Sequence, residues 1–327
     1  MTMSAPLVAV GIVQALLYLL FIRFVDLYER EPLRYVIPVF VWGFAVATTA
    51  SLIFNTVAAV TISTVASEQA TSAITAVFVA PVVEESFKGL ALIIVFAVAL
   101  VMRRRGSMEY SGVMDGIVYG SAVGFGFAIA EDLLYYAQYG AETFVVRRLF
   151  GGFAHAAFTS LTGVGIGLIP WVRNGFLKVA LPLTGLICAM LLHAIFNFTA
   201  TAFGAVAYVL LLGVVTVYLV LIVVWLAVER RTIRDELRDE VGFGTISPEE
   251  YGILPTYFRR TGYYLGLLFQ GRLGAWRIAR KVHNTAVDLA FTKRLARRSW
   301  SASGESRVAE QRARIQALRG TAAAART

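Results

Sequence analysis

Residues 73–101, AITAVFVAPVVEESFKGLALIIVFAVALV, form one apolar run whose only ionisable side chains are Glu84, Glu85 and Lys88 near its middle. A helix needs about 20 apolar residues to cross the hydrocarbon core of a bilayer. Hydrocarbon offers no water to backbone amides, so a chain that crosses it is expected to be helical. The run therefore predicts a membrane-spanning helix that carries charged groups inside the bilayer.

The same length criterion predicts six further spans, and the seven together account for a chain that is 58% hydrophobic. The predicted spans are residues 5–24, 36–60, 73–101, 113–136, 150–170, 178–203 and 205–228. We expect an all-α fold, with a polytopic transmembrane helical bundle of about seven spans in residues 1–228. A helical cytoplasmic tail is expected in residues 229–327.

Small side chains and the single cysteine give further limits. The pairs Gly120/Gly124 and Gly163/Gly167 have the small-xxx-small spacing that lets membrane helices approach closely. Cys188 is the only cysteine, which excludes a disulfide framework and a Cys-rich zinc site.

The net charge of +9 lies in the tail. Residues 229–327 hold 19 of the 30 Lys and Arg residues but only 10 of the 21 Asp and Glu residues. A basic tail beside a membrane domain favours anionic lipid headgroups as partners, and no nucleic-acid-binding motif is present. Residues 273–298 are basic and amphipathic, which predicts either a helix lying on the inner leaflet or a small cytoplasmic helical hairpin with a solvated basic face.

Two local predictions concern the ends of tail helices. Ser247-Pro248-Glu249-Glu250 has the cap, the first-turn proline and the first-turn acids of a helix start. The last twenty residues are rich in Ala and Arg, and we expect them to be poorly ordered or frayed.

Charges in the connecting segments predict the orientation. The first, third and fifth loops hold several Lys and Arg residues, the second and sixth hold none, and the fourth holds Arg147 and Arg148. The positive-inside rule then puts the N-terminus outside the cell membrane and the tail in the cytoplasm. The first apolar run has no basic segment before it, so we interpret it as a retained span and not as a signal peptide.

Ionisable residues at bilayer depth cost about 3 kcal/mol each on insertion scales and are usually functional. Besides Glu84, Glu85 and Lys88, the spans carry Glu131 with Asp132, His155, and His193 with Asn197. At a rise of 1.5 Å per residue, these groups from four different helices all fall in the outer half of the membrane. They are therefore predicted to share one pocket.

Spacing within each helix refines this prediction. His193 and Asn197 are four residues apart and share a helix face, and Glu84 and Lys88 have the same spacing, which allows a local ion pair. Glu84 and Glu85 point about 100° apart, so only one of them can face the reacting centre. The other is expected to hold that first carboxylate, or a water, in place. Pro81 is expected to kink the span and to free a backbone carbonyl or two.

Four motifs resemble those of PrsW-type intramembrane proteases and, more distantly, the CAAX prenyl protease clan. They are Glu84-Glu85-x-x-Lys88, Phe127-x-x-x-Glu131, His155 with Thr159 and Gly163, and His193-x-x-x-Asn197. Residues 26–32 and 115–120 are also similar to this family, which often has Asn where this chain has Asp132.

The resemblance implies peptide-bond hydrolysis in or at the membrane. The implied substrate is a single-pass membrane protein. In some relatives the substrates are membrane-bound regulators such as anti-sigma factors. Glu84 or Glu85 would activate a water and later protonate the leaving amine, while His193 and Asn197 would bind the scissile carbonyl oxygen. Lys88, Phe127 and Asp132 would support the site.

Several alternatives stay open. Glu131 and His155 would orient the water, or would join His193 around a metal, for which zinc is the candidate. No H-E-x-x-H motif is present to decide between glutamate-only and zinc chemistry. Glu and His chains inside a bundle also serve proton-coupled transporters. A non-catalytic scaffold whose basic tail recruits partners is the third possibility.

Overall fold

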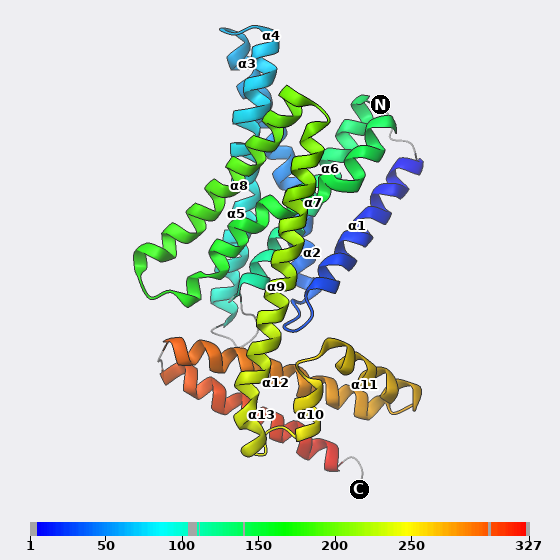
Figure 1. Cartoon of the computed structure of the whole chain (residues 1–327), viewed down its shortest axis with the longest axis vertical. Coiled ribbons are helices and arrows are strands. Elements are labelled where there is room, and N and C mark those ends of the chain that lie inside the picture. The colour runs from blue at the N-terminus through cyan, green and yellow to red at the C-terminus, as the bar shows by residue number, and fades with distance from the viewer. Residues whose placement is uncertain (1–4, 104–109, 111, 140, 300–301, 325–327) are drawn as a thin grey trace. The chain divides into compact units, whose positions relative to one another are not determined.

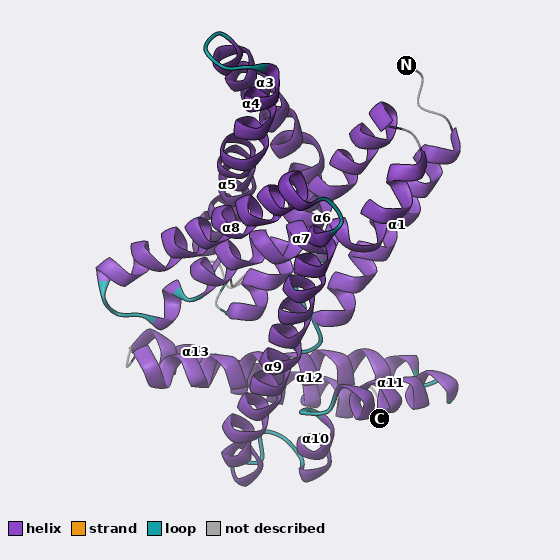
Figure 2. Cartoon of the chain, turned by 45° about the horizontal axis from the view of Figure 1, so that its top comes forward, coloured by secondary structure: helices purple, strands orange, loops and turns teal. Residues whose placement is uncertain are grey.

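The computed structural model describes residues 5–103, 110, 112–139, 141–299 and 302–324. Every described element is a helix, which confirms the all-α prediction (Figures 1 and 2). The membrane region contains α1 (Ala5–Val25), α2 (Leu33–Val41), η1 (Trp42–Ala47), α3 (Thr48–Ser63), α4 (Glu68–Ile74), η2 (Thr75–Val79), α5 (Ala80–Arg103), α6 (Val113–Tyr139), α7 (Ala141–Gly167), η3 (Ile169–Trp171), α8 (Gly175–Phe203) and α9 (Val206–Gly242). The tail contains α10 (Pro248–Ile253), α11 (Tyr257–Phe269), α12 (Leu273–Ser299) and α13 (Ala302–Ala324).

Seven segments of the described chain are long and apolar enough to cross a membrane, as predicted. The second span joins α2, η1 and α3, and the third joins α4, η2 and α5. The helix of the seventh span, α9, continues beyond the predicted end of that span at residue 228 and ends at Gly242. The chain divides into one unit of Met1–Asp26 with Glu31–Ile222, and a second unit of Leu27–Arg30 with Val223–Thr327.

Helix α6 is the buried centre of the first unit, because an 18-residue stretch of its span is entirely buried within the protein. A Cβ placed on Gly163 of α7 would meet the backbone of Gly116 of α6, and one on Gly120 would meet the backbone of Ser160. The glycines thus bring the two backbones into direct contact, as the small-xxx-small pairs predicted. This close crossing fixes the α7 side chains relative to those of α6.

The second unit has a core of its own. Val282 and Leu289 of α12 are buried together with Ile233 of α9 and Ile315 of α13. The apolar face of α12 is therefore covered by protein within the tail. The Ser247 hydroxyl and the Glu250 carboxylate form the reciprocal hydrogen bonds of a capping box, which confirms the predicted start of α10.

The end of the chain differs from the prediction. The last twenty residues were expected to be frayed, but the described part of them continues α13 as a helix to Ala324. The prediction failed because Ile315 packs in the tail core, and such packing orders a helix that composition alone leaves marginal.

Candidate functional site

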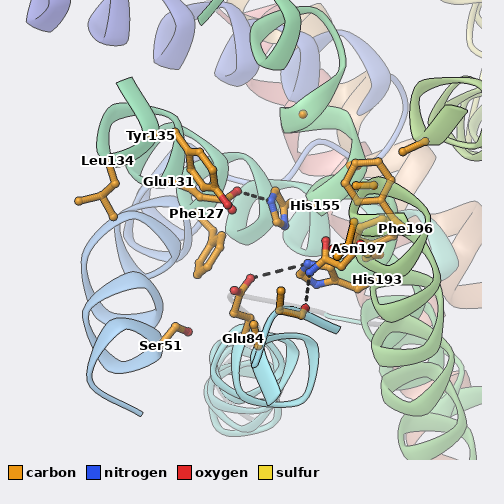
Figure 3. A pocket seen from close by; sticks show the side chains of 18 of the residues that line it. Ser51, Glu84, Phe127, Glu131, Leu134, Tyr135, His155, His193, Phe196 and Asn197 are labelled. Atoms are coloured by element: carbon orange, nitrogen blue, oxygen red, sulfur yellow. Dashed lines mark hydrogen bonds and ion pairs between the residues drawn. The ribbon is translucent and has the colours of Figure 1, made fainter. Parts of the chain in front are cut away.

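A cavity of about 550 Å³ opens among the membrane helices of the first unit (Figure 3). Its walls include Glu84 of α5, Glu131 of α6, His155 of α7, and His193 with Asn197 of α8. These are five of the six residues predicted to form the site. Four helices thus converge as the depth argument predicted, although the six residues do not all face the cavity.

Glu84 and Glu85 have different environments. Glu84 lines the cavity, and its side chain keeps 10% of its accessible surface. Glu85 is completely buried behind it, where Oε2 accepts a hydrogen bond from Thr159 Oγ1 at 2.9 Å and Oε1 contacts His193 Nδ1 at 3.1 Å. The structure therefore answers a question the sequence left open, because Glu84 is the carboxylate that faces the cavity.

Lys88 is the cation of the site, and its side chain is fully buried. Its ammonium lies 2.9 Å from Glu85 Oε1, 3.4 Å from Glu84 Oε2 and 3.0 Å from His155 Nδ1. It also lies 3.8 Å from the centre of the Phe127 ring, within range of a cation–π interaction. The predicted ion pair with Glu84 is present, but the shorter contact is with Glu85, three residues before Lys88.

Each histidine of the site has a carboxylate on one ring nitrogen. His155 Nε2 lies 2.7 Å from Glu131 Oε2, and His193 Nδ1 lies 3.1 Å from Glu85 Oε1. The other nitrogen of His193, Nε2, lies 3.9 Å from Glu84 Oε2. A carboxylate that accepts from one ring nitrogen fixes the orientation of the ring. At His193 this leaves Nε2 for a ligand or a water, whereas Nδ1 of His155 contacts Lys88.

Two residues of α7 complete this arrangement. Phe158 stacks on the His193 ring with centroids 5.1 Å apart, and Thr159 donates to Glu85. Thr159 belongs to the His155 motif quoted from the sequence, but neither residue was predicted to act in the site. Their spacing from His155, three and four residues along the same helix face, was the signal that could have found them.

The Asn197 side chain donates to a backbone carbonyl that Pro81 leaves without a donor. The segment before Pro81 is the π-helical η2, in which Ala80 N–H donates to the carbonyl of Thr75, five residues earlier. The next carbonyl in that register, Ala76 O, would need the N–H that proline lacks. Asn197 Nδ2 donates to Ala76 O at 2.8 Å. The freed carbonyl was predicted, and the structure shows that it ties α8 to the third span.

Asp132, predicted as a supporting residue, is not among the residues that line the cavity. It is buried and accepts a hydrogen bond from Gln14 Nε2 of α1 at 3.3 Å. It lies about 100° around α6 from Glu131, which does line the cavity, and it faces α1 instead.

The wall contributed by α3 was not predicted. Thr48, Ser51, Leu52 and Asn55 line the cavity along one face of α3. Ser51 Oγ and Asn55 Oδ1 are buried without a hydrogen-bond partner among the described residues. Buried polar atoms normally have partners, so these two suggest groups that a bound molecule satisfies. Their four-residue spacing within an apolar span was the available signal.

The comparisons with known proteins agree with this geometry. A family model described as "PrsW family intramembrane metalloprotease" matches residues 31–228, which include every residue of the site. The chain belongs to the PrsW family. No solved structure gives a significant match.

Curated relatives of this PrsW-family chain match shorter stretches. The chain is 33% identical over 121 residues to Protease PrsW of Shouchella clausii, covering 37% of this chain and 52% of that one. It is 30% identical over 161 residues to Protease PrsW of Geobacillus kaustophilus, covering 49% and 65%, and 34% identical over 97 residues to Protease PrsW of Bacillus subtilis, covering 30% and 44%. The matches thus span about half the length of these relatives.

The family description implies a metal, and the donor set of the site fits one. Ligand atoms of Glu84, His155 and His193 lie within 4.8 Å of one another, and two histidines with one carboxylate are a known zinc set. Glu131 was one of the alternative ligands predicted from the sequence, and its carboxylate lies 2.7 Å from His155 Nε2. Lys88 contacts His155 Nδ1, so a metal held there would require its ammonium to move away.

Proposed function

We propose that this chain is an intramembrane endopeptidase in which Glu84 activates the attacking water. The observation that supports the proposal is that the two adjacent carboxylates have different environments. Glu84 lines the cavity, while Glu85 is buried in contacts with Lys88, His193 and Thr159. A base has to reach the water, whereas an orienting residue has to be held in place.

The position of the water follows from the distance between Glu84 and His193. Glu84 Oε2 and His193 Nε2 lie 3.9 Å apart, which is too long for a hydrogen bond and short enough for one water to bond to both. In this mechanism Glu84 takes a proton from that water as it attacks the scissile carbonyl. Glu84 then returns the proton to the leaving amine. His193 holds the water, and Glu85 together with the stacked Phe158 holds the His193 ring.

The remaining groups bind the substrate and the developing charge. One N–H of the Asn197 amide donates to Ala76 O, and we assign the second N–H to the oxygen of the scissile carbonyl. Ser51 and Asn55 on the opposite wall supply hydrogen-bonding atoms for the substrate backbone. The Lys88 ammonium offsets the charge of the two carboxylates.

A metal, when bound by Glu84, His155 and His193, would polarise the scissile carbonyl and lower the pKa of a bound water. Glu85 and Glu131 would then orient the two histidine ligands through their other ring nitrogens. Glu84 and His193 would then hold the metal with the side chains that hold the water in the metal-free mechanism.

We further propose that the substrate is a single-pass membrane protein and that the N-terminus of the enzyme lies outside the cell with its tail in the cytoplasm. A cavity walled by membrane-spanning helices supports a substrate that enters from the bilayer. The distribution of Lys and Arg between the loops supports the orientation. A membrane-bound regulator such as an anti-sigma factor is a substrate of this class.

The test uses the purified full chain in lipid nanodiscs with a fluorogenic single-span peptide, with and without a zinc chelator. We expect cleavage by the wild type and none by Glu84→Gln at equal folded yield. Thr56→Ala, on the exposed side of α3, is the matched control and should cleave normally. Loss of cleavage with chelator, restored by added zinc, would assign the metal. Wild-type protein that is folded and does not cleave would refute the proposal.

A further inference from the structure

Helix α11 of the tail has two different faces. Arg260 and Leu267 are buried against the tail. Phe258, Leu265 and Phe269 are exposed by 79%, 45% and 89%, and their spacing of seven and four residues puts them on one helix face. Two phenylalanines so fully exposed on one stripe indicate a contact surface and not scattered surface residues.

The start of α11 is hydrogen-bonded to the short segment that joins the first two membrane spans. Arg260 Nη2 donates to Leu27 O, and Tyr28 OH donates to Pro255 O at 3.0 Å. Arg30 Nη2 donates to the hydroxyl of Tyr257 at 3.1 Å. Residues 27–30 join the first span, which ends at Val25, to the second, which begins at Leu33. A connection this short keeps them at the membrane face, and the start of α11 is bound to them.

Three arginines lie beside this corner. Arg230, Arg234 and Arg259 line a cavity of about 380 Å³ together with Thr256. Within the described residues, none of the three arginines forms an ion pair with a carboxylate. Arg230 comes two residues after Val228, where the apolar run of α9 ends. Lipid phosphates lie where the apolar run of a membrane span ends, and guanidinium groups bind phosphate well.

We propose that α11 lies on the membrane surface, with Phe258, Leu265 and Phe269 inserted at the boundary between headgroups and acyl chains. The three arginines bind the anionic headgroups beside it. An exposed apolar stripe flanked by basic residues is typical of interfacial helices. Residues 27–30 are covalently joined to the first two spans, and the tail is covalently joined to α9. Because these connections keep α11 close to the membrane, we assign the bilayer as the occupant of its exposed apolar face. For residues 273–298 of α12 the sequence pattern allowed either this role or a cytoplasmic hairpin, and the apolar face of α12 is covered within the tail core.

The experiment measures the depth of α11 in the full chain. In a Cys188→Ser background, single cysteines at Phe258→Cys, Leu265→Cys and Phe269→Cys carry an environment-sensitive fluorophore. The labelled proteins are placed in nanodiscs of anionic and zwitterionic lipid that contain a nitroxide quencher on the acyl chain. Arg238→Cys is the control, because it is exposed and lies about 15 Å along α9 beyond Val228.

We expect the three α11 labels to lose about half of their emission in anionic nanodiscs, and the control label to lose almost none. Replacing Arg230, Arg234 and Arg259 with Gln should reduce the quenching in anionic nanodiscs to the level seen in zwitterionic ones. Quenching at all three α11 positions no greater than at Arg238→Cys would overturn the proposal. Fluorophores that report burial at the three α11 positions without quenching by lipid would instead indicate that a protein partner covers this face. That result would equally overturn the proposal.

Discussion

Replacing Lys88 with methionine should strongly destabilise the membrane unit. The Lys88 ammonium has no exposed surface and lies 2.9 Å from Glu85 Oε1. At an effective dielectric constant of about 20, that distance corresponds to a gross attraction of about 6 kcal/mol. The desolvation of both ions offsets part of it, and breaking a buried pair by removing one partner costs about 3–5 kcal/mol. We therefore expect Lys88→Met to lower the free energy of unfolding by about 3–5 kcal/mol and to abolish cleavage.

The assay is reversible unfolding in mixed micelles with increasing SDS, followed by tryptophan fluorescence. Lys178→Met, an exposed lysine of α8, is the matched control and should change the free energy of unfolding by less than about 0.5 kcal/mol. Glu85→Gln added to Lys88→Met removes the uncompensated charge, so the two changes together should cost about 2 kcal/mol less than their sum. A Lys88→Met effect equal to that of the control, or strictly additive changes, would refute the ion-pair reasoning.

Gly163→Leu places a side chain against the backbone of Gly116 and should cost at least about 3 kcal/mol of stability, whereas Gly213→Leu, in open space, should cost little; thermal midpoints by size-exclusion chromatography compare them. Burial lowers the pKa of His283 from 6.5 to about 4, with further lowering by Arg260 and Arg319. The unfolded tail therefore binds a proton that the folded tail does not, and stability that is complete above pH 6.5 falls by about 3 kcal/mol as the pH drops to about 4. Hydrogen exchange of tail peptides across this range should show the loss, and His283→Gln should abolish it. Asn197→Leu leaves Ala76 O without its donor and should lower stability by about 1–3 kcal/mol; an unchanged unfolding curve would remove that hydrogen bond from the account.

The sequence predicted the spans and the meeting of four helices, because both follow from helix length and rise. It could not predict which of Glu84 and Glu85 faces the cavity. That choice depends on the rotation of the third span, which Trp42 and Asn197 fix by donating to Phe87 O and Ala76 O. Rotation about a helix axis is set by neighbours, and an apolar span carries little information about it.

The sequence also missed features that arise only when helices pack. Ser51 and Asn55 are ordinary polar residues of an apolar span until α3 is placed opposite Glu84. In the tail, α12 is longer and more basic than α11, yet its apolar side is buried by α9 and α13. Amphipathicity shows that a helix has an apolar face, but not whether lipid or protein covers that face.

The central claim is that Glu84 acts on the water while Glu85 holds His193 and Lys88. The most direct test compares the cleavage rates of Glu84→Gln and Glu85→Gln per folded molecule. Glu84→Gln should lose about 10³-fold or more in kcat with unchanged peptide binding. Glu85→Gln should lose less, about 10–100-fold, because its amide oxygen still accepts from His193 Nδ1. An inactive Glu85→Gln beside an active Glu84→Gln would contradict the account.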